Sequence, residues 1–495
     1  MSFSWCLSNL YKVCASKKRG ERLCDVINLL LRFEFKHTKK TFTTHYECFN
    51  INTSSNSAKR APIMTNESAT ANNAPDTPTL IQKAKDTLIA NDLGGYTVPT
   101  HGLYPFQWNW DSAITALGWK HFDEKRAWQE LEVLFDGQWD NGMVPHILFH
   151  KDSSTYFPGP DVWGSDKRVK STSISQPPVV ASVIKDMLDT ADDKVLARSK
   201  AGALFSSLVD YHLWWYKERD PLNTGLVVTY HPWESGMDNS PAWDEALDAV
   251  PCVDWEYQRR DLGHVDSSQR PHKSEYDRFL FLVDFFKKNN FDSEVIFNTC
   301  PYKVNDIGII AILHKGSKDI LALSETLGIK DERLDYIAQR IALTEKTIST
   351  LWCEDSQFFF SRNVLTDTLC KVRTSAGLLT VYAGLASAPQ VQTLNTTAQQ
   401  WSQASQYSIA STHPQESCYE PQRYWRGPIW LHISWMIALG FEQAGHQDTA
   451  DKLQRDSRAL IDLSGYYEYF NPETGAGCGG NDFSWTAAIA LHWLL

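Results

Sequence analysis

The sequence lacks the features that would assign it to a membrane, to a disulfide framework or to a metal site. It contains no apolar run of about 18 residues, the length that a membrane-spanning helix requires. Its 10 cysteines are scattered with no C-x-x-C pair, which predicts reduced thiols in a cytoplasmic protein. It has no EF-hand loop and no His/Cys ligand spacing, so we expect no metal and no other cofactor.

Positive charge is scarce beyond the first 63 residues. The 495-residue chain has a net charge of −11. Residues 1–63 hold 11 Lys/Arg against 4 Asp/Glu, so the remainder carries 37 basic and 55 acidic residues, a balance of −18. This acidic body argues against a nucleic-acid partner, because phosphate backbones are bound by clustered Lys and Arg. Tryptophan is abundant instead: the 19 Trp residues either fill a large core or line a sugar-binding cleft.

The N-terminal part of the chain differs in composition from the rest. Residues 24–35 include a short apolar run, too short and too charged at its flanks for a secretory signal. Met64 opens a Ser/Thr/Asn/Ala/Pro-rich tract, a composition typical of a disordered leader. We therefore expect residues 1–75 to be a disordered or non-native extension of the domain, in which residues 1–63 precede a natural start at Met64. Residues 76–495 are predicted to form one domain.

Apolar residues of this domain recur mostly with the period of an α-helix. The predicted helices cover residues 82–91, 110–121, 123–138, 177–190, 195–218, 275–289, 307–327, 333–352, 376–386, 398–407, 428–445, 449–463 and 483–495. Strands are few and short, at residues 225–230 and 358–360. Helix pairs that alternate with long loops favour an all-α toroid whose loops gather at one mouth. A helical solenoid is the weaker alternative, because no fixed-period repeat is present.

Two acidic residues in separate aromatic loops are candidates for catalysis. Asp238 precedes Ser240 and Pro241, which suit the cap and the first position of a helix, so ordinary turn chemistry is one interpretation. Glu468 lies among four aromatic residues, where burial disfavours its anion, unless it points to solvent from an edge strand. Cleavage of a glycosidic bond needs such a pair, one to protonate the leaving oxygen and one to act opposite.

Five motifs, in order over about residues 80–495, together resemble glycoside hydrolase family 63. They are Y-P-F-Q-W-N-W-D (104–111), G-Q-W-x-N-G-M-V-P-H (137–146), H-P-W-E-S-G-M-D-N-S-P-x-W-D (231–244), Y-W-R-G-P-I-W (424–430) and E-Y-F-N-P-x-T-G (468–475) followed by F-S-W-T-A-A (483–488). Within the family they are most similar to the mannosylglycerate and glucosylglycerate hydrolase branch. The resemblance implies an (α/α)₆ barrel and hydrolysis with inversion. It implies Asp238 as general acid and Glu468 as general base.

The resemblance also implies a set of substrate contacts. Glycone contacts are expected from Tyr104, Trp108 and Asp111, aromatic walls from Trp425 and Trp430, and hydrogen bonds from Tyr424 and Gln176. Arg270 and Tyr276 are expected to contact the aglycone, although Arg270 stands in a loop without a strong motif and a surface position is the alternative. Glu234 is interpreted as a support of the Asp238 loop.

These assignments predict measurable geometry and chemistry. For inversion the two carboxyl groups should stand about 6.5–9.5 Å apart, whereas about 5 Å would indicate retention. Burial and the charge of Glu468 are expected to raise the pKa of Asp238 against the dipole of the helix that follows. The leading function is an inverting α-glycosidase for a small solute such as glucosylglycerate or mannosylglycerate. An α-glucosidase for oligosaccharides or trehalose-like disaccharides and a non-catalytic sugar-binding barrel are the alternatives; the oligomeric state is open.

Overall fold

The computed structural model describes residues 75–263 and 265–495. The predicted extension, residues 1–75, lies outside this part but for its last residue. Among the described residues no helix is long and apolar enough to cross a membrane.

Six helices of the described chain form a closed inner ring, in which each packs on the next and the last packs on the first. They are α4 (Asn109–Trp119), α7 (Val180–Thr190), α12 (Ile307–Leu327), α14 (Leu379–Tyr382), α16 (Leu431–Gln443) and α18 (Ser484–Ile489). In α4, α14 and α18 every residue is buried. Such a helix is stable only when other helices surround it.

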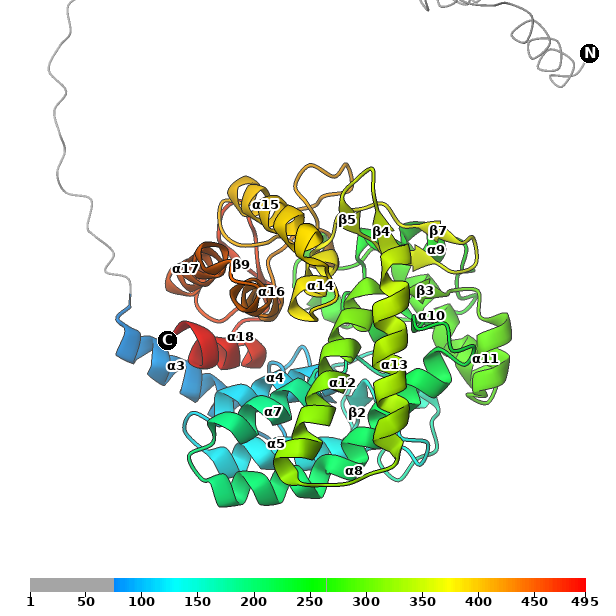
Figure 1. Ribbon diagram of the computed structural model, residues 1–495. Coiled ribbons are helices and arrows are strands. Elements are labelled where there is room, and N and C mark those ends of the chain that lie inside the picture. Colours follow the sequence, from blue (N-terminus) through cyan, green and yellow to red (C-terminus); the bar gives the residue numbers. More distant parts are fainter. Residues whose placement is uncertain (1–74, 264) are drawn as a thin grey trace, which may run out of the picture. The chain divides into compact units, whose positions relative to one another are not determined.

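A second set of six helices in the described chain packs outside the ring (Figure 1). These are α3 (Thr77–Ala90), α5 (Glu124–Asp136), α8 (Lys194–Arg219), α13 (Arg333–Thr347), α15 (Ala388–Ala404) and α17 (Gln447–Ser464). Helix α17, for example, is amphipathic: it buries Leu453, Leu460 and Ile461 and leaves its opposite side polar. Outer and inner helices alternate along the chain, so the domain is the (α/α)₆ barrel that the sequence predicted.

The connections that lead into the inner helices carry the remaining elements. They hold the longer helix α10 (Lys273–Lys288), the short helices α6 (Pro160–Trp163), α9 (Asp244–Asp248) and α11 (Ser293–Thr299), and the 3₁₀ turns η2 (Pro232–Ser235), η3 (Pro241–Trp243), η4 (Asp261–Gly263), η5 (Ser267–Gln269), η6 (Ile348–Leu351), η7 (Ser375–Leu378) and η8 (Tyr424–Arg426). The π-helical η9 (Ala490–Leu494) follows α18. Bridges Thr374–Thr412, Ala410–Ile429 and Ile429–Phe470 join the connections before α14, α16 and α18. The connections therefore support one another at one end of the barrel.

All described strands are two residues long and pair antiparallel. The pairs are β1 (Gln107–Trp108) with β2 (Ile147–Leu148), β4 (Trp352–Cys353) with β5 (Phe358–Phe359) and β8 (Tyr469–Phe470) with β9 (Gly477–Cys478). A three-stranded sheet has the order β3 (Val304–Asn305), β6 (Arg362–Asn363), β7 (Thr368–Leu369).

Two predicted elements are wrong in part. The strand expected at residues 225–230 is only one bridge, between Thr229 and Val304. Its backbone is instead bound by the end of α8 and by a side chain: Val228 N–H donates to Arg219 O (2.7 Å), and Asn305 Nδ2 donates to Leu226 O (3.0 Å). The helix expected at 398–407 begins ten residues earlier, at Ala388, where Ser387 and Gln390 form a capping box.

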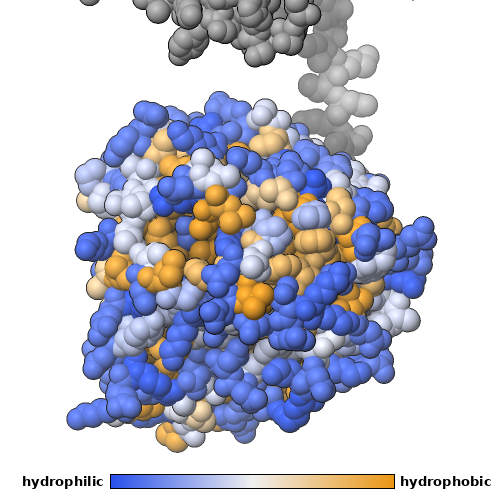
Figure 2. Space-filling model, turned by 90° about the vertical axis from the view of Figure 1, so that its right-hand side faces the viewer, coloured by the Kyte–Doolittle hydropathy of each residue, from blue (hydrophilic) through white to orange (hydrophobic). Residues whose placement is uncertain are grey.

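The face of the molecule that carries α10, α11 and β7 is mostly hydrophilic, with a broken band of apolar residues across it (Figure 2). Val295 of α11 and Leu365, between β6 and β7, are exposed apolar residues. The cysteines of the described part, Cys252, Cys300, Cys353, Cys370, Cys418 and Cys478, are free thiols.

Candidate active site

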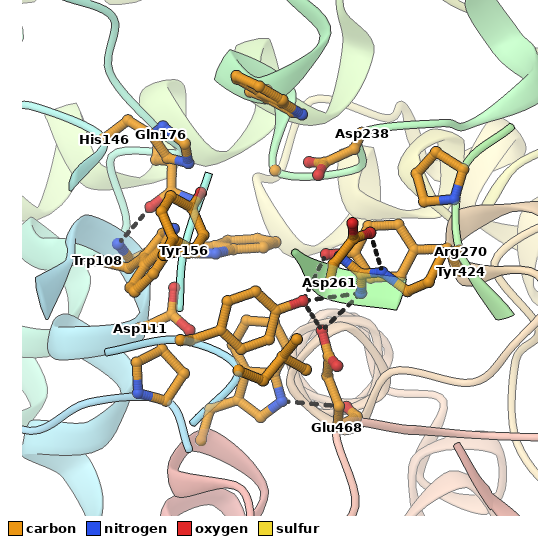
Figure 3. Close-up of a pocket in the computed structure, with 18 of the residues that line it drawn as sticks. Trp108, Asp111, His146, Tyr156, Gln176, Asp238, Asp261, Arg270, Tyr424 and Glu468 are labelled. Atoms are coloured by element: carbon orange, nitrogen blue, oxygen red, sulfur yellow. Dashed lines mark hydrogen bonds and ion pairs between the residues drawn. The ribbon is translucent and has the colours of Figure 1, made fainter. Parts of the chain in front are cut away.

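A cavity opens where the connections into the inner helices meet (Figure 3). It is lined by Pro99, Leu103, Tyr104, Trp108, Trp110, Asp111, His146, Tyr156, Phe157, Gln176, Trp233, Gly236, Asp238, Asp261, Arg270, Pro271, Tyr276, Tyr424, Glu468, Phe483 and Trp485. Aromatic rings and carboxyl groups dominate this lining. Rings stack on the apolar faces of sugars and carboxyl groups bind hydroxyls, so the cavity suits a carbohydrate.

Asp238 lies in the connection between α8 and α12, on the side of the cavity opposite Glu468 (Figure 3). The predicted cap is present: Ser240 Oγ accepts from the N–H of Ala242 at the start of η3. The neighbouring Asn239 is held from another connection, because its Oδ1 accepts from Trp425 N–H at 2.9 Å. Asp238 is thus fixed by its chain neighbours, while its carboxyl group remains partly exposed to the cavity.

The surroundings of Asp238 favour its protonated form. Burial raises the pKa of Asp238 to about 8, with a smaller increase from the negative charge of Glu468. Arg270 opposes this shift of the pKa, as does the backbone N–H of Asp238 itself. No other described residue donates a hydrogen bond to its carboxyl group, and η3 with α9 is a short helical segment. The predicted rise is therefore confirmed, and the cation that opposes it is Arg270.

Glu468 immediately precedes β8 and is 1% exposed. Its Oε1 accepts from Tyr104 Oη at 2.9 Å and its Oε2 from Gly480 N–H at 3.1 Å. Arg270 Nη1 lies 3.8 Å from Oε1. Burial raises the pKa of Glu468, and Arg270, Gly480 and Tyr104 all act in the opposite direction. The solvent-facing alternative for this residue is wrong, because the carboxylate is buried with three groups that stabilise its charge.

The two carboxyl groups therefore share one cavity but differ in their partners. Glu468 has two hydrogen-bond donors and a neighbouring guanidinium, which favour a carboxylate that can accept a proton. Asp238 has a carboxyl group that burial keeps protonated near neutral pH. Environments that separate the pKa values of two acids define an acid and a base.

Asp111 adds a third carboxyl group to the cavity, from the first turn of α4. Burial raises its pKa well above the usual range, and Glu468 and Asp238 raise it further. A protonated Asp111 can donate a hydrogen bond as well as accept one, which suits a contact with a sugar hydroxyl.

The other predicted contacts that line the cavity are Tyr104, Trp108, Gln176, Tyr424, Arg270 and Tyr276. The Tyr104 and Trp108 rings pack edge to face with centroids 5.3 Å apart. Gln176 Oε1 accepts from Trp110 N–H at 3.3 Å, which orients its amide. Tyr424 adopts a φ of 48°, a left-handed conformation that is uncommon for a bulky residue and typical of functional sites.

Comparison with known proteins identifies the family of this fold and cavity. The family model described as "Mannosylglycerate hydrolase MGH1-like glycoside hydrolase domain" matches residues 104–486. The chain belongs to this family. It is accordingly a glycoside hydrolase of the family 63, mannosylglycerate hydrolase-like type.

Members of the family from distant organisms are similar over most of their length. Mannosylglycerate hydrolase MGH2 of Selaginella moellendorffii is 45% identical over 84% of this chain and 85% of its own. Glucosylglycerate hydrolase of Mycolicibacterium hassiacum is 31% identical over 84% and 98%. A crystal structure of the GH63 mannosylglycerate hydrolase from Thermus thermophilus, in complex with Tris and D-glycerate, has a TM-score of 0.81 at 44% identity. The match covers 84% of this chain and 99% of the Thermus chain.

Arg270 is not a surface residue in this glycoside hydrolase. It is 6% exposed, its Nη1 donates to Tyr104 Oη at 2.8 Å and its Nε to Asp261 Oδ2 at 3.1 Å. Its guanidinium carbon lies 4.3 Å from the centroid of the Tyr424 ring. Tyr276 is also buried, and its hydroxyl donates to Phe157 O at 2.8 Å. Both residues line the cavity, and Arg270 also neighbours Glu468.

Trp425 and Trp430 are not walls of the cavity, contrary to the expectation. Their rings stack on each other, with centroids 3.8 Å apart and planes 2° apart, and each side chain is 1% exposed. Neither residue lines the cavity, whereas Tyr424 does. Trp430 Nε1 donates to Tyr424 O at 3.2 Å, so the pair supports the residue that lines the site. The motif identified the connection that lines the cavity, but it could not show which of its aromatic side chains faces the cavity.

Glu234 supports the Asp238 loop, as the sequence predicted. It is fully buried, its Oε1 accepts from Arg219 Nη2 at 2.6 Å, and its Oε2 accepts from Tyr230 N–H at 2.8 Å. The salt bridge ties η2 to the end of α8.

Sequence reasoning missed Asp261 and Tyr156 as cavity residues and gave His146 no role. Asp261 pairs with Arg259 and Arg270, at 2.6 Å and 3.1 Å. The sequence places Asp261 directly after two arginines, which could have indicated a buried ion pair. The same pattern is also typical of an ordinary salt bridge on the surface. Tyr156 stands in no motif. Burial lowers the pKa of His146 well below its usual range, so this cavity residue is a neutral imidazole.

Proposed function

We propose that the protein hydrolyses α-glycosides of glycerate, such as mannosylglycerate or glucosylglycerate, with inversion at the anomeric carbon. Asp238 is the general acid and Glu468 the general base. The names of the relatives support the substrate class, and the Thermus structure holds D-glycerate. The observation that carries the proposal is the pair of carboxyl groups that face one cavity with different partners: Glu468 accepts two hydrogen bonds and lies beside Arg270, whereas burial raises the pKa of Asp238 to about 8.

The proposed reaction uses each group once. Asp238 transfers its proton to the glycosidic oxygen as the bond to the anomeric carbon breaks. Glu468 accepts a proton from the water that attacks that carbon from the opposite face. The products are the free sugar, in inverted configuration, and glycerate. Tyr104, Trp108, Asp111, Gln176 and Tyr424 are the proposed sugar contacts.

Arg270 and Tyr276 are the proposed aglycone contacts. Arg270 is buried and lines the cavity, and its positive charge already faces Asp261 and Glu468. A carboxylate of the substrate would be a third anion beside the same guanidinium. Substitution of Arg270 by Met should therefore slow every substrate, because the base also loses its cation. If kcat/KM falls further for glycerate glycosides than for neutral disaccharides, the difference reports the contact of Arg270 with the aglycone carboxylate. Equal loss of kcat/KM for both classes contradicts that contact.

Matched substitutions test the acid and the base. We expect Asp238→Asn and Glu468→Gln to reduce kcat by a factor of about 10³ or more, since general catalysis and water activation are both lost. Asp248→Asn and Glu473→Gln are the controls, because these exposed carboxylates lie outside the cavity. Undiminished turnover in either site variant overturns the assignment.

A substrate screen with NMR detection tests the substrate and the stereochemistry. Glucosylglycerate, mannosylglycerate, trehalose and kojibiose are compared, and the anomer released first is recorded. We expect a glycerate glycoside to be the best substrate and the β-anomer to appear first. Faster turnover of both disaccharides favours the α-glucosidase alternative, and initial release of the α-anomer refutes inversion.

We further propose that the protein acts in the cytoplasm. The free thiols of the described cysteines suit a reducing compartment. Fractionation of the native cells, with detection of the activity in the soluble or the secreted fraction, tests this location.

A further inference from the structure

The guanidinium of Arg270 is placed beside the base by a segment that belongs to none of the barrel helices. Arg270 follows η5 (Ser267–Gln269), in the long connection between α8 and α12. Glu468 lies in a different connection, between α17 and α18. The distance of 3.8 Å between Arg270 Nη1 and Glu468 Oε1 therefore depends on contacts that join these two connections, either directly or through Tyr104.

Gln269 makes two of those contacts. Its side-chain Oε1 accepts from Gly479 N–H at 2.9 Å, and its backbone carbonyl accepts from Tyr469 Oη at 2.7 Å. The next amide of the same turn, Gly480 N–H, donates to Glu468 Oε2 at 3.1 Å. Gln269 and the base are thus bound to successive amides of one turn, and Arg270 is the residue after Gln269.

The side chains of Arg270 and Glu468 also share Tyr104, because Arg270 Nη1 donates to its hydroxyl and that hydroxyl donates to Glu468 Oε1. The remaining attachments of this segment lead away from Glu468. Arg423 Nη1 donates to Arg270 O at 2.9 Å, and Gln422 Nε2 donates to Ser268 Oγ at 3.2 Å. Both donors belong to the connection before α16. They hold the segment on the barrel, but they do not set its position relative to Glu468.

We propose that Gln269 is a positioning residue, which fixes the segment that carries Arg270 to the turn that binds Glu468. This inference rests on the proposed role of Glu468 as general base. Without the Gln269 side chain, the segment that carries Arg270 loses its hydrogen bond to the turn that binds Glu468. The position of the Arg270 guanidinium relative to the Glu468 carboxylate is then less well fixed.

The position of Arg270 should be visible in the pH profile, because several charges act on Glu468. The titratable groups that face it are Tyr104 and Asp111 from the α4 side, Asp238, Asp261, Arg270 and Tyr424 from the other connections, and Tyr469 and Cys478 from its own hairpin. Among the main influences on the pKa of Glu468, Arg270 is the largest that lowers it. Loss of this influence raises the pKa of the base, so the acidic limb of kcat/KM moves to higher pH. The basic limb moves in the same direction, since Arg270 also lowers the pKa of Asp238.

Gln269→Leu removes the acceptor with little change of size. We expect its acidic limb to lie about one pH unit higher than in the wild type, equal to roughly tenfold lower kcat/KM below the limb. The matched control is Gln422→Leu, the same substitution at a residue that holds the same segment away from the base. Its limbs should coincide with those of the wild type. If Gln269→Leu does not fold, Tyr469→Phe is the second variant, because it removes the hydroxyl that donates to Gln269 O. We expect it to move the acidic limb of kcat/KM in the same direction.

A double-mutant cycle separates this role from a general loss of structure. If Gln269 acts through Arg270, Gln269→Leu adds no further shift of the limb to that of Arg270→Met. An unmoved limb in Gln269→Leu, or shifts that add in the double variant, overturns the inference. Glu468→Gln distinguishes the two proposals. If that variant retains turnover, the role of Glu468 as general base is refuted. If it is inactive and the acidic limb of Gln269→Leu has not moved, only the positioning role of Gln269 is refuted.

Discussion

Gly479→Ala is expected to displace the carboxylate of Glu468, the proposed base. Gly479 has a φ of +72°, and a Cβ on it would lie 2.3 Å from Glu468 Oε2 and 2.6 Å from Tyr469 Cε1. Ordinary contact begins at 3.4 Å, so the carboxylate oxygen must move by about 1 Å. A displacement of this size at a reacting group costs on the order of 10²-fold in rate, or about 2.7 kcal/mol.

The structure provides a matched control for this substitution. Gly445 has a φ of +84°, and a Cβ on it would meet nothing within 4 Å. Alanine in a left-handed conformation costs about 1–2 kcal/mol at either position. Both variants should therefore lose similar stability from the backbone, and Gly479→Ala loses more from the contact with Glu468.

Steady-state hydrolysis of a glycerate glycoside and thermal melting, measured on both variants, test this reasoning. We expect Gly445→Ala to keep the wild-type kcat/KM, and Gly479→Ala to lose about two orders of magnitude. Activity of Gly479→Ala within a few-fold of that of Gly445→Ala would show that the turn does not constrain the base.

Further expectations concern the acid, the aromatic stack and the buried salt bridge. Because Asp238 must be protonated and its pKa is raised to about 8, kcat/KM should decline as the pH rises through this value; a profile that stays flat there contradicts the assignment. A folded-state pKa above the unfolded value means that folding loses stability between the two values as the pH rises. Asp238→Asn should thus melt at a higher temperature than the wild type, by a margin that grows with pH up to about 8. Trp425→Ala should cost about 3–5 kcal/mol of stability. Trp108→Phe should instead raise KM, because Trp108 lines the cavity. If Trp425→Ala raised KM without a loss of stability, Trp425 would have to be a wall of the cavity after all. Glu234→Gln breaks the pair with Arg219 and should destabilise the protein by about 3–5 kcal/mol while both pH limbs stay in place; a moved limb would give Glu234 a part in the chemistry.

The sequence predicted the elements whose signals are local. Periodicity gave the long helices, and the residues around Asp238 gave its cap at Ser240. The start of α15 was missed because the apolar face weakens over residues 388–397, although Ser387 and Gln390 mark it by their capping box.

What the sequence could not show depends on contacts between distant connections. Trp425 and Tyr424 are adjacent in one motif, yet only Tyr424 lines the cavity, because the inward side is set by the packing of Trp425 on Trp430 and by the hydrogen bond that Trp425 N–H donates to Asn239 Oδ1. The partners of Arg270 are 166 residues away at Tyr104 and 9 residues away at Asp261. No spacing rule links such positions.

The ring of inner helices closes only when α18 packs on α4. The residues that line the cavity extend from Pro99 to Trp485, and Glu468, the proposed general base, lies in the connection that leads into α18. Without this last contact of the ring, we expect the connection that carries Glu468, the proposed base, not to be held against the rest of the cavity. Hydrolysis thus measures completed closure of the barrel, and a refolding assay by activity would count closed rings rather than helix content.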